Sequence, residues 1–437
     1  MCGAQTSQNV LTKLHDIAEM AAANSEWTFS NISYRINPEL LHEAYRQTRK
    51  DATPGVDKVT AEEYVKNLDE NLKHLHERLV KGQYKAPPVE RVWIDKEDGK
   101  KRPIGIPTFE DKIVQRGVTM VLNPIYETDF YPFSYAFRKG FNQHQAIHTL
   151  RECCIGMNIN WILDADVSGF FNNLDHDILR EFISRRVTDK GICRLIGKWL
   201  NAGVLEDDIL SYPEKGTPQG GVISPLLANL YLHYVLDDWY IKEVRPRMKG
   251  RSFLVRYADD FVLGFEYEED ARRFMKVLAK RFNKFGLDIN ESKTSLVNFS
   301  KRANKSRVSK EESTFDFLGF TFYRGKTLKG YYTIKKRTAK KGLNRFMKML
   351  WIWCRNNRHM PLKEQHQKLC SKLRGHYQYY GVRCNYEALE KVYEYAYQAW
   401  RYWLSRRCHK GNIIWKKFTE SIKVHFRLPT PRIVHSI

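Results

Sequence analysis

The sequence predicts an α+β fold, and three observations carry this prediction. Residues 90–330 interleave short apolar runs with longer stretches patterned like helices. Residues 38–86 carry apolar positions at helical spacing on both sides of a Pro-Gly turn at 53–57, which predicts two helices. Residues 331–437 combine a helical apolar stripe with a strong positive charge. We therefore expect a mixed core with helices before and after it.

Composition points to a nucleic-acid partner. The chain has 437 residues, of which 42% are hydrophobic, enough for two or three domains with a large core. Its net charge of +23 predicts a polyanionic partner, either nucleic acid or an anionic membrane. No apolar run reaches the length of a membrane span, and the N-terminal residues lack the pattern of a signal peptide. We therefore expect a cytoplasmic protein that binds nucleic acid and no membrane.

Cysteine usage argues against a zinc site or a disulfide framework. The eight cysteines form no CxxC pair, and no histidine cluster accompanies them. Reduced thiols in the cytosol are the better interpretation.

The strongest site signal is a pair of adjacent carboxylates between two apolar runs. Residues 253–255 and 261–263 are typical of strands, and Tyr257-Ala258-Asp259-Asp260 predicts a tight turn between them with Asp259 and Asp260 at its tip. Burying adjacent carboxylates is unfavourable unless a cation compensates, and Mg²⁺ prefers such oxygen ligands. An ordinary acidic turn would contain the same residues, so the pair alone does not decide.

A second acidic strand supports the metal interpretation. The apolar segment 161–167 contains Asp164 and Asp166, which are two residues apart and share one strand face. Three carboxylates on adjacent strands can hold two metal ions about 3.5–4 Å apart, the arrangement that phosphoryl transfer uses. Strand geometry does not separate Asp164 from Asp166 as the ligand.

Positive charge concentrates in the last quarter of the chain. Residues 331–437 contain 24 Lys and Arg against 5 Glu and no Asp, a net charge of +19. Within residues 386–407 an apolar stripe favours a helix-bundle core; it comprises Leu389, Val392, Tyr393, Ala396, Trp400, Trp403 and Leu404. The basic residues around it are candidates for binding RNA backbone: Arg401, Arg406, Arg407 and Lys410.

Seven sequence blocks, in order, carry a family resemblance. They are KKRPIGIPTFEDKIVQ at 100–115, SYAFRKGF at 134–141, DVSGFFNNLDH at 166–176, KGTPQGGVISPLLANLYL at 215–232, YADD at 257–260, NESKT at 290–294 and FDFLGF at 315–320. From about residue 35 to the C-terminus, the chain resembles bacterial group II intron-encoded reverse transcriptases and maturases. Ala136, Lys139 and Asn172 depart from the usual family pattern and leave the subtype open.

The resemblance implies a right-hand polymerase fold with three regions. Residues 1–35 would be an N-terminal leader, 36–330 the fingers and palm, and 331–437 a basic helical thumb and maturase region. The C-terminal DNA endonuclease of longer relatives, with its paired metal-site cysteines, is not expected in this chain. Mobility would then need a nick or a replication-fork primer supplied elsewhere.

The resemblance also implies the metal ligands and the reaction. Asp166, Asp259 and Asp260, with the Val167 carbonyl, would hold two Mg²⁺ ions, or Mn²⁺ in their place. Asp164 would be a hydrogen-bonded carboxylate beside the site. The enzyme would copy an RNA template, either group II intron RNA or another RNA, into DNA from a DNA primer and dNTPs. As a maturase it would bind intron RNA, assist splicing, and associate with ribonucleoprotein or the nucleoid.

Nucleotide contacts are implied in the same way. Phe171, five residues past Asp166, would exclude the 2′-hydroxyl, although the adjacent Phe170 leaves an uncertainty of one residue. Gln219 would contact the incoming nucleotide. The other implied residues are basic: Lys100, Lys101 and Arg102 for the triphosphate, with Arg102 preferred; Arg91 as a weaker candidate; and Lys293 supporting the catalytic strands or the primer.

Rival interpretations remain open from the sequence. The chain could be a non-catalytic RNA-binding splicing factor, although intact YADD, Asp166 and QGG argue against it. It could be a domesticated reverse transcriptase in repair or phage defence. An RNA-dependent RNA polymerase shares the palm but is disfavoured by Phe171. The sequence leaves a monomer and a homodimer equally open.

Overall fold

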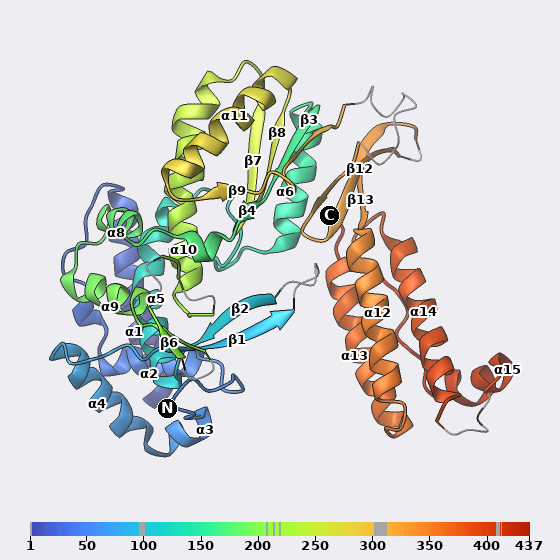
Figure 1. Ribbon diagram of the computed structural model, residues 1–437, viewed down its shortest axis with the longest axis horizontal. Helices are drawn as coiled ribbons and strands as arrows, with labels where there is room; N and C mark the ends of the chain where they lie inside the picture. The colour runs from blue at the N-terminus through green and yellow to red at the C-terminus, as the bar shows by residue number, and fades with distance from the viewer. Residues whose placement is uncertain are drawn as a thin grey trace.

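The computed structural model places helices and strands in three groups (Figure 1). It describes residues 2–95, 101–206, 209–212, 215–217, 220–300, 313–327, 329–407, 411 and 413–437. A helical layer with a small sheet comes first, a central sheet flanked by helices follows, and a C-terminal bundle ends the chain.

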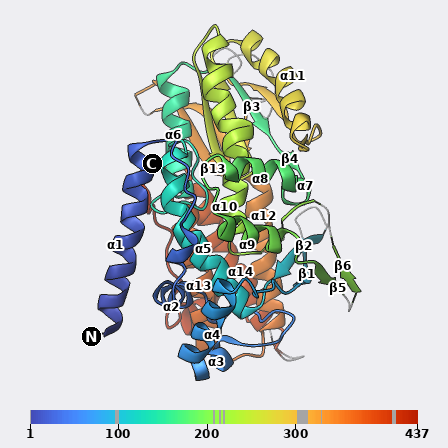
Figure 2. The same cartoon turned by 90° about the vertical axis from the view of Figure 1, so that its left-hand side faces the viewer.

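The first group is mainly helical. Its helices are α1 (Cys2–Ala23), α2 (Pro38–Gln47), α3 (Ala61–Tyr64), α4 (Leu68–Val80) and α5 (Phe109–Asp129). The helix α1 stands at one side of the molecule (Figure 2) and packs on α5 through Val10, Ile17 and Ala21, which are buried on one face. Residues 1–35 therefore contain a helix that contributes to the core. The predicted helices flank the Pro-Gly turn, with α2 before it and α3 and α4 after it.

An N-terminal sheet extends from this helical layer. Its strand order is β2-β1-β5-β6, with β1 at Val89–Asp95, β2 at Lys101–Ile106, β5 at Val204–Glu206 and β6 at Ile209–Ser211. The helices α8 (His176–Ser184), α9 (Lys190–Leu200) and α10 (Ser224–Leu232) connect it to the central sheet.

The central sheet positions the candidate site. Its order is β10-β3-β8-β7, all antiparallel, with β3 at Trp161–Ala165, β7 at Ser252–Tyr257, β8 at Asp260–Phe265 and β10 at Ser295–Asn298. Alternate residues of β7 and β8 enter two different cores, because strand side chains alternate between faces. Leu254 and Leu263 join the core of α11 (Glu268–Lys284), whereas Val255 and Val262 join that of α6 (Gln143–Gly156).

The C-terminal group begins with a three-stranded sheet. Its order is β11-β12-β13, at Phe315–Phe317, Phe320–Lys326 and Tyr332–Thr338. The helices that follow are α12 (Lys340–Asn356), α13 (Leu362–Tyr380), α14 (Tyr386–Leu404) and the short α15 (Trp415–Phe418), and Figure 1 shows α12, α13 and α14 side by side.

The apolar stripe of α14 is core, as predicted. Leu389, Val392, Ala396, Trp400 and Leu404 are buried in one cluster with residues of α12 and α13, while Tyr393 and Trp403 pack at its edge.

Two of the basic residues near the stripe bind backbone of their own chain. Arg401 donates to the Ile413 carbonyl at 2.9 Å, and Arg407 donates to the carbonyls of Arg358 and Met360. These guanidinium groups therefore tie loops to the bundle, while Arg406 is exposed and Lys410 lies outside the described residues.

Six cysteines fall in the described residues with their side chains, and all six are free. Across the described parts of the chain, no helix combines the length and the apolarity that crossing a membrane requires.

Candidate active site

The hairpin of the central sheet places two of the predicted ligands at its tip. The strands β7 and β8 are antiparallel and their last pair is Tyr257 with Asp260, so Ala258 and Asp259 form a two-residue turn. Ala258 has a φ of 58°, the left-handed conformation that tight hairpin turns use. The predicted strands and their acidic tip are confirmed.

Asp166 lies beside this tip. The strand β3 pairs with β8, and the last pair is Ala165 with Phe261, so Asp166 and Asp260 follow as the next positions of the two strands. The chain then enters β4 (Val167–Ser168), which pairs with β9 (Asp288–Ile289) in a separate two-stranded sheet. Asp166 therefore sits where two sheets diverge, while Asp164 lies within β3.

These carboxylates repel one another. Burial, followed by the charges of Asp164, Asp259 and Asp166, raises the pKa of Asp260 to about 8. Burial, followed by Asp316 and Asp166, raises the pKa of Asp164 to about 7.

Asp259 is subject to opposing influences. Burial raises the pKa of its carboxyl, while its own backbone N–H and the nearby Arg102 guanidinium lower it. Without a cation, this corner of the sheet therefore favours protonated carboxyls.

The donor set fits a divalent cation. Carboxylate oxygens are the ligands that Mg²⁺ prefers, and a cation would relieve the repulsion that raises these pKa values. In the described part of the chain, no three acidic, histidine or cysteine side chains lie close enough together to form a metal site. The carboxylates are thus electrostatic neighbours and not a closed ligand cage.

The NESKT turn holds Asp166 in place. The Asn290 amide Nδ2 donates to the Asp166 carboxylate at 3.0 Å, and the Asn290 backbone N–H donates to the Asp166 carbonyl at 2.8 Å. Lys293 Nζ lies 3.2 Å from the same carboxylate, and the Thr294 hydroxyl accepts from the Asp166 N–H at 3.4 Å. The turn therefore contacts this carboxylate directly and brings Lys293 to it.

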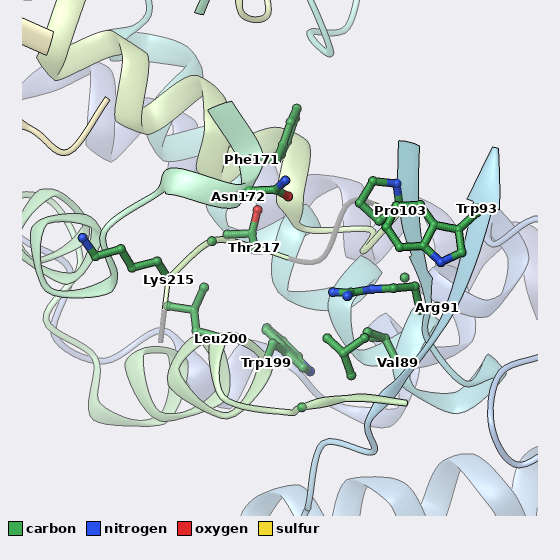
Figure 3. Close-up of a pocket in the computed structure, with 14 residues that line it drawn as sticks. Val89, Arg91, Trp93, Pro103, Phe171, Asn172, Trp199, Leu200, Lys215 and Thr217 are labelled. Atoms are coloured by element: carbon green, nitrogen blue, oxygen red, sulfur yellow. The ribbon is translucent and has the colours of Figure 1, made fainter. Parts of the chain in front are cut away.

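A cavity of about 280 Å³ lies between the N-terminal sheet and the segment around Phe171. Figure 3 shows Arg91, Trp93 and Pro103 on one side of it, with Phe171, Asn172 and Thr217 on another. The remaining lining residues are Val89, Gly105, Trp199, Leu200, Gly203, Val204, Lys215 and Gly216. None of the carboxylates Asp164, Asp166, Asp259 and Asp260 lines this cavity. Its wall includes Phe171, which lies five residues after Asp166 in the sequence.

The two adjacent phenylalanines have different surroundings. Phe171 lines the cavity and is 8% exposed, whereas Phe170 is 2% exposed and packs edge to face on Tyr231. Of the pair, Phe171 is therefore the one that faces the cavity.

The glycine-rich loop approaches the N-terminal sheet closely. Gly220 has a φ of 120°, and a Cβ built there would lie 2.4 Å from the Gly105 carbonyl oxygen in β2. Earlier in the loop, the Thr217 N–H donates to the Phe171 carbonyl at 2.8 Å. Glycine thus allows the backbone of this loop to meet the backbone of β2. Gln219 itself lies outside the described residues.

The predicted basic residues of the N-terminal sheet have different environments. Arg91 pairs with Glu206 at 3.2 Å, and Glu206 also accepts from the Trp93 indole at 2.6 Å. The charge of Arg102 opposes the burial that raises the pKa of the Asp259 carboxyl, and Lys101, next to Arg102 in β2, is exposed. Lys100 lies outside the described residues.

Sequence reasoning missed several polar residues of this region. The sequence around Glu206 does not indicate its ion pair, because its partner Arg91 lies far away in the chain. Thr217 lies inside a recognised block, and its buried hydroxyl finds no hydrogen-bond partner among the described residues. Asn290 also belongs to a recognised block, but its contact with Asp166 depends on the tertiary fold.

The fold and this acidic corner define a class, the right-hand polymerases, with α+β fingers and palm and a helical thumb. The model of the family described as reverse transcriptase (RNA-dependent DNA polymerase) matches residues 94–322. The chain belongs to the reverse transcriptase family.

Named relatives place it near group II intron proteins. Protein YkfC of Escherichia coli is 36% identical over 288 residues, covering 56% of this chain and 75% of YkfC. The group II intron-encoded protein LtrA of Lactococcus lactis is 29% identical over 389 residues, covering 74% of this chain and 62% of LtrA. An uncharacterized 91 kDa protein in a cob intron of Schizosaccharomyces pombe is 30% identical over 261 residues, 58% of this chain and 31% of that protein. The match therefore spans less than two thirds of the length of the last two relatives.

Proposed function

We propose that this protein is the RNA-directed DNA polymerase of a group II intron. The observation that carries the proposal is the meeting of Asp166, Asp259 and Asp260 at the junction of β3 and the β7–β8 hairpin, where burial and the charges of neighbouring carboxylates raise the pKa of Asp260 to about 8. Clustered negative charge favours the binding of divalent cations, which reverse transcriptases generally use.

Different residues of the chain would have different roles in the reaction. Asp166, Asp259 and Asp260, with the Val167 carbonyl, would hold two Mg²⁺ ions, or Mn²⁺ in their place. When bound, the ions would supply charge neutralisation for the attack of a primer 3′-hydroxyl on the α-phosphate of a dNTP. Asn290 and Lys293 contact the Asp166 carboxylate, while Asp164 adds negative charge near Asp260.

The cavity is the proposed place of the incoming nucleotide's sugar. Phe171 forms one wall, and its ring would exclude a 2′-hydroxyl. Arg102, near Asp259, would meet the triphosphate, together with Lys100 and Lys101, which precede it in the sequence, and Gln219, which precedes Gly220. Arg91 is already paired with Glu206, so its contact with a nucleotide would require exchange of that partner.

The C-terminal region is the proposed RNA grip. Residues 36–330 would form the fingers and palm and 331–437 the thumb and maturase region, whose net charge of +19 suits a phosphate backbone. The name of LtrA, a group II intron-encoded protein, supports intron RNA as the partner, and assistance of splicing is the second proposed role.

Primer extension tests the proposal. Purified protein would extend a DNA primer on an RNA template with dNTPs and Mg²⁺, and the double variant Asp259→Ala, Asp260→Ala would not. A matched control is Glu268→Ala, Glu269→Ala on the surface of α11, which removes the same charge and should extend normally. If the unaltered protein bound RNA tightly but did not extend the primer, the polymerase proposal would be wrong and a splicing factor would be favoured.

A further inference from the structure

A buried arginine stands directly behind the acidic hairpin turn. Arg256, the next-to-last residue of β7, has no exposed surface. Its Nε donates to Asp237 at 2.8 Å, and its Nη1 donates to Asn229 Oδ1 and to the Ala258 carbonyl, both at 3.1 Å. The guanidinium therefore links the turn to α10 and to the π-helical segment His233–Asp237 that follows it.

The backbone of Arg256 is held as firmly as its side chain. Its N–H donates to the Phe133 carbonyl at 2.9 Å, and its carbonyl accepts from the Tyr135 N–H at 3.0 Å. Asn229 completes the connection, since its Nδ2 donates to the Ala136 carbonyl at 2.7 Å. Three of the sequence blocks, SYAF, SPLLAN and YADD, thus meet in one buried polar network.

Through its contact with the Ala258 carbonyl, this network constrains the hairpin turn. Ala258 has a φ of 58°, a conformation that residues other than glycine keep only when their surroundings impose it. The two carboxylates that follow, Asp259 and Asp260, take their direction from this turn. They also repel each other, so something must keep the turn from relaxing away from the site.

We propose that Arg256 is a positioning residue, which holds the Ala258 carbonyl and thereby aims Asp259 and Asp260 at the site. Asp237 and Asn229 fix the guanidinium, and the guanidinium fixes the turn. The consequence for catalysis rests on the proposed polymerase function, whereas the effect on the turn does not.

A second buried ion pair provides a matched control. Arg186 is 2% exposed, lies 3.0 Å from Asp129, and donates to the carbonyls of Asn24 and Trp27 at 3.0 Å. It has the same chemistry as Arg256, but it ties the end of α1 to the segment after α8. Replacing both members of a buried ion pair by apolar residues is often tolerated, so both pairs can be exchanged without leaving an unpaired charge.

The experiment compares Arg256→Met, Asp237→Val with Arg186→Met, Asp129→Val by hydrogen–deuterium exchange in the full-length protein without metal. Amides of residues 257–261 should exchange at least tenfold faster in the first pair only, at equal distance below each melting temperature. Equal exchange in the two pairs would overturn the proposal. If the first pair does not fold, Arg256→Lys, which keeps the charge but not the guanidinium fork, decides by the same criterion.

Primer extension then separates the two proposals. In the first pair kcat should fall at least tenfold, with unchanged affinity for primer–template and normal kcat in the control pair. Unchanged kcat in the first pair would refute the positioning role. If the unaltered protein does not extend primers, the polymerase function has failed, and hydrogen exchange still decides whether Arg256 holds the turn.

Discussion

Two carboxyl groups of this protein, Asp111 and Asp260, show how neighbours give burial opposite meanings. Asp111 in α5 is 2% exposed, yet burial raises its pKa only to about 6, because the Tyr84 hydroxyl, the Trp199 indole and Gln115 donate hydrogen bonds to it. Burial also raises the pKa of Asp260, and the charges of Asp164, Asp259 and Asp166 raise it further, to about 8.

The difference separates a structural carboxyl from one suited to bind cations. Neutral donors within the protein offset much of the cost of burying Asp111, although its pKa stays above the ordinary 3.8. Like charges leave Asp260 short of a partner, so only a proton or a cation can satisfy it. The charge of the neighbouring groups, more than the depth of burial, thus distinguishes the two sites.

The largest effect should come from Asp260→Asn. Extension should fall by about 10²–10³-fold, the loss that follows removal of one preorganised electrostatic group in other enzymes. In EDTA at pH 8 the variant should melt at a higher temperature than the unaltered protein, because it removes one of the repelling charges. Mg²⁺ should raise the melting temperature of the unaltered protein only. Asp164→Asn provides the comparison: it should also gain stability but lose less than tenfold in extension.

Asp111→Asn should change stability and not extension. The folded pKa of about 6 exceeds the ordinary 3.8, so folding favours the protonated form and stability declines as pH rises from about 4 to about 6. Relative to the unaltered protein, the neutral variant should therefore gain up to about 3 kcal/mol at pH 8 and little at pH 4. Urea unfolding at the two pH values measures this. A variant that is less stable at both would show that the carboxylate's hydrogen bonds outweigh its burial.

Phe171→Val should relax sugar selection at the cavity that Phe171 lines. Loss of the ring should raise the use of rNTPs relative to dNTPs by roughly 10–100-fold, the range over which pocket shape discriminates. Phe170→Val is the matched control: it should lower the melting temperature and leave the ratio unchanged. Competition between rNTP and dNTP on one template measures the ratio, and the reverse pattern would assign the selection to Phe170.

Lys293→Ala should have the smallest effect. The ion pair with Asp166 is exposed at both members, and such pairs contribute about 0.2–1 kcal/mol, so the Mg²⁺ concentration for half-maximal extension should change only about two- to fivefold. A loss larger than tenfold would mean that Lys293 contacts the substrate.

The sequence by itself determined the α+β class, the hairpin with its acidic tip, and the buried stripe of α14. These are local properties: apolar periodicity, β-branched and aromatic runs, and the residues of a tight turn act over a few positions. The order of the sequence blocks identified the polymerase resemblance, and with it Asp166 as a neighbour of the hairpin.

Only the tertiary structure decided which side chains meet across the chain. It separated Phe171, on the cavity, from Phe170, in the core, and it brought Asn290 and Lys293 to Asp166. It also assigned Arg401 and Arg407 to backbone carbonyls, although their composition alone suggested free cations for RNA. Strand register and helix packing set these contacts, and both depend on residues far apart in the sequence.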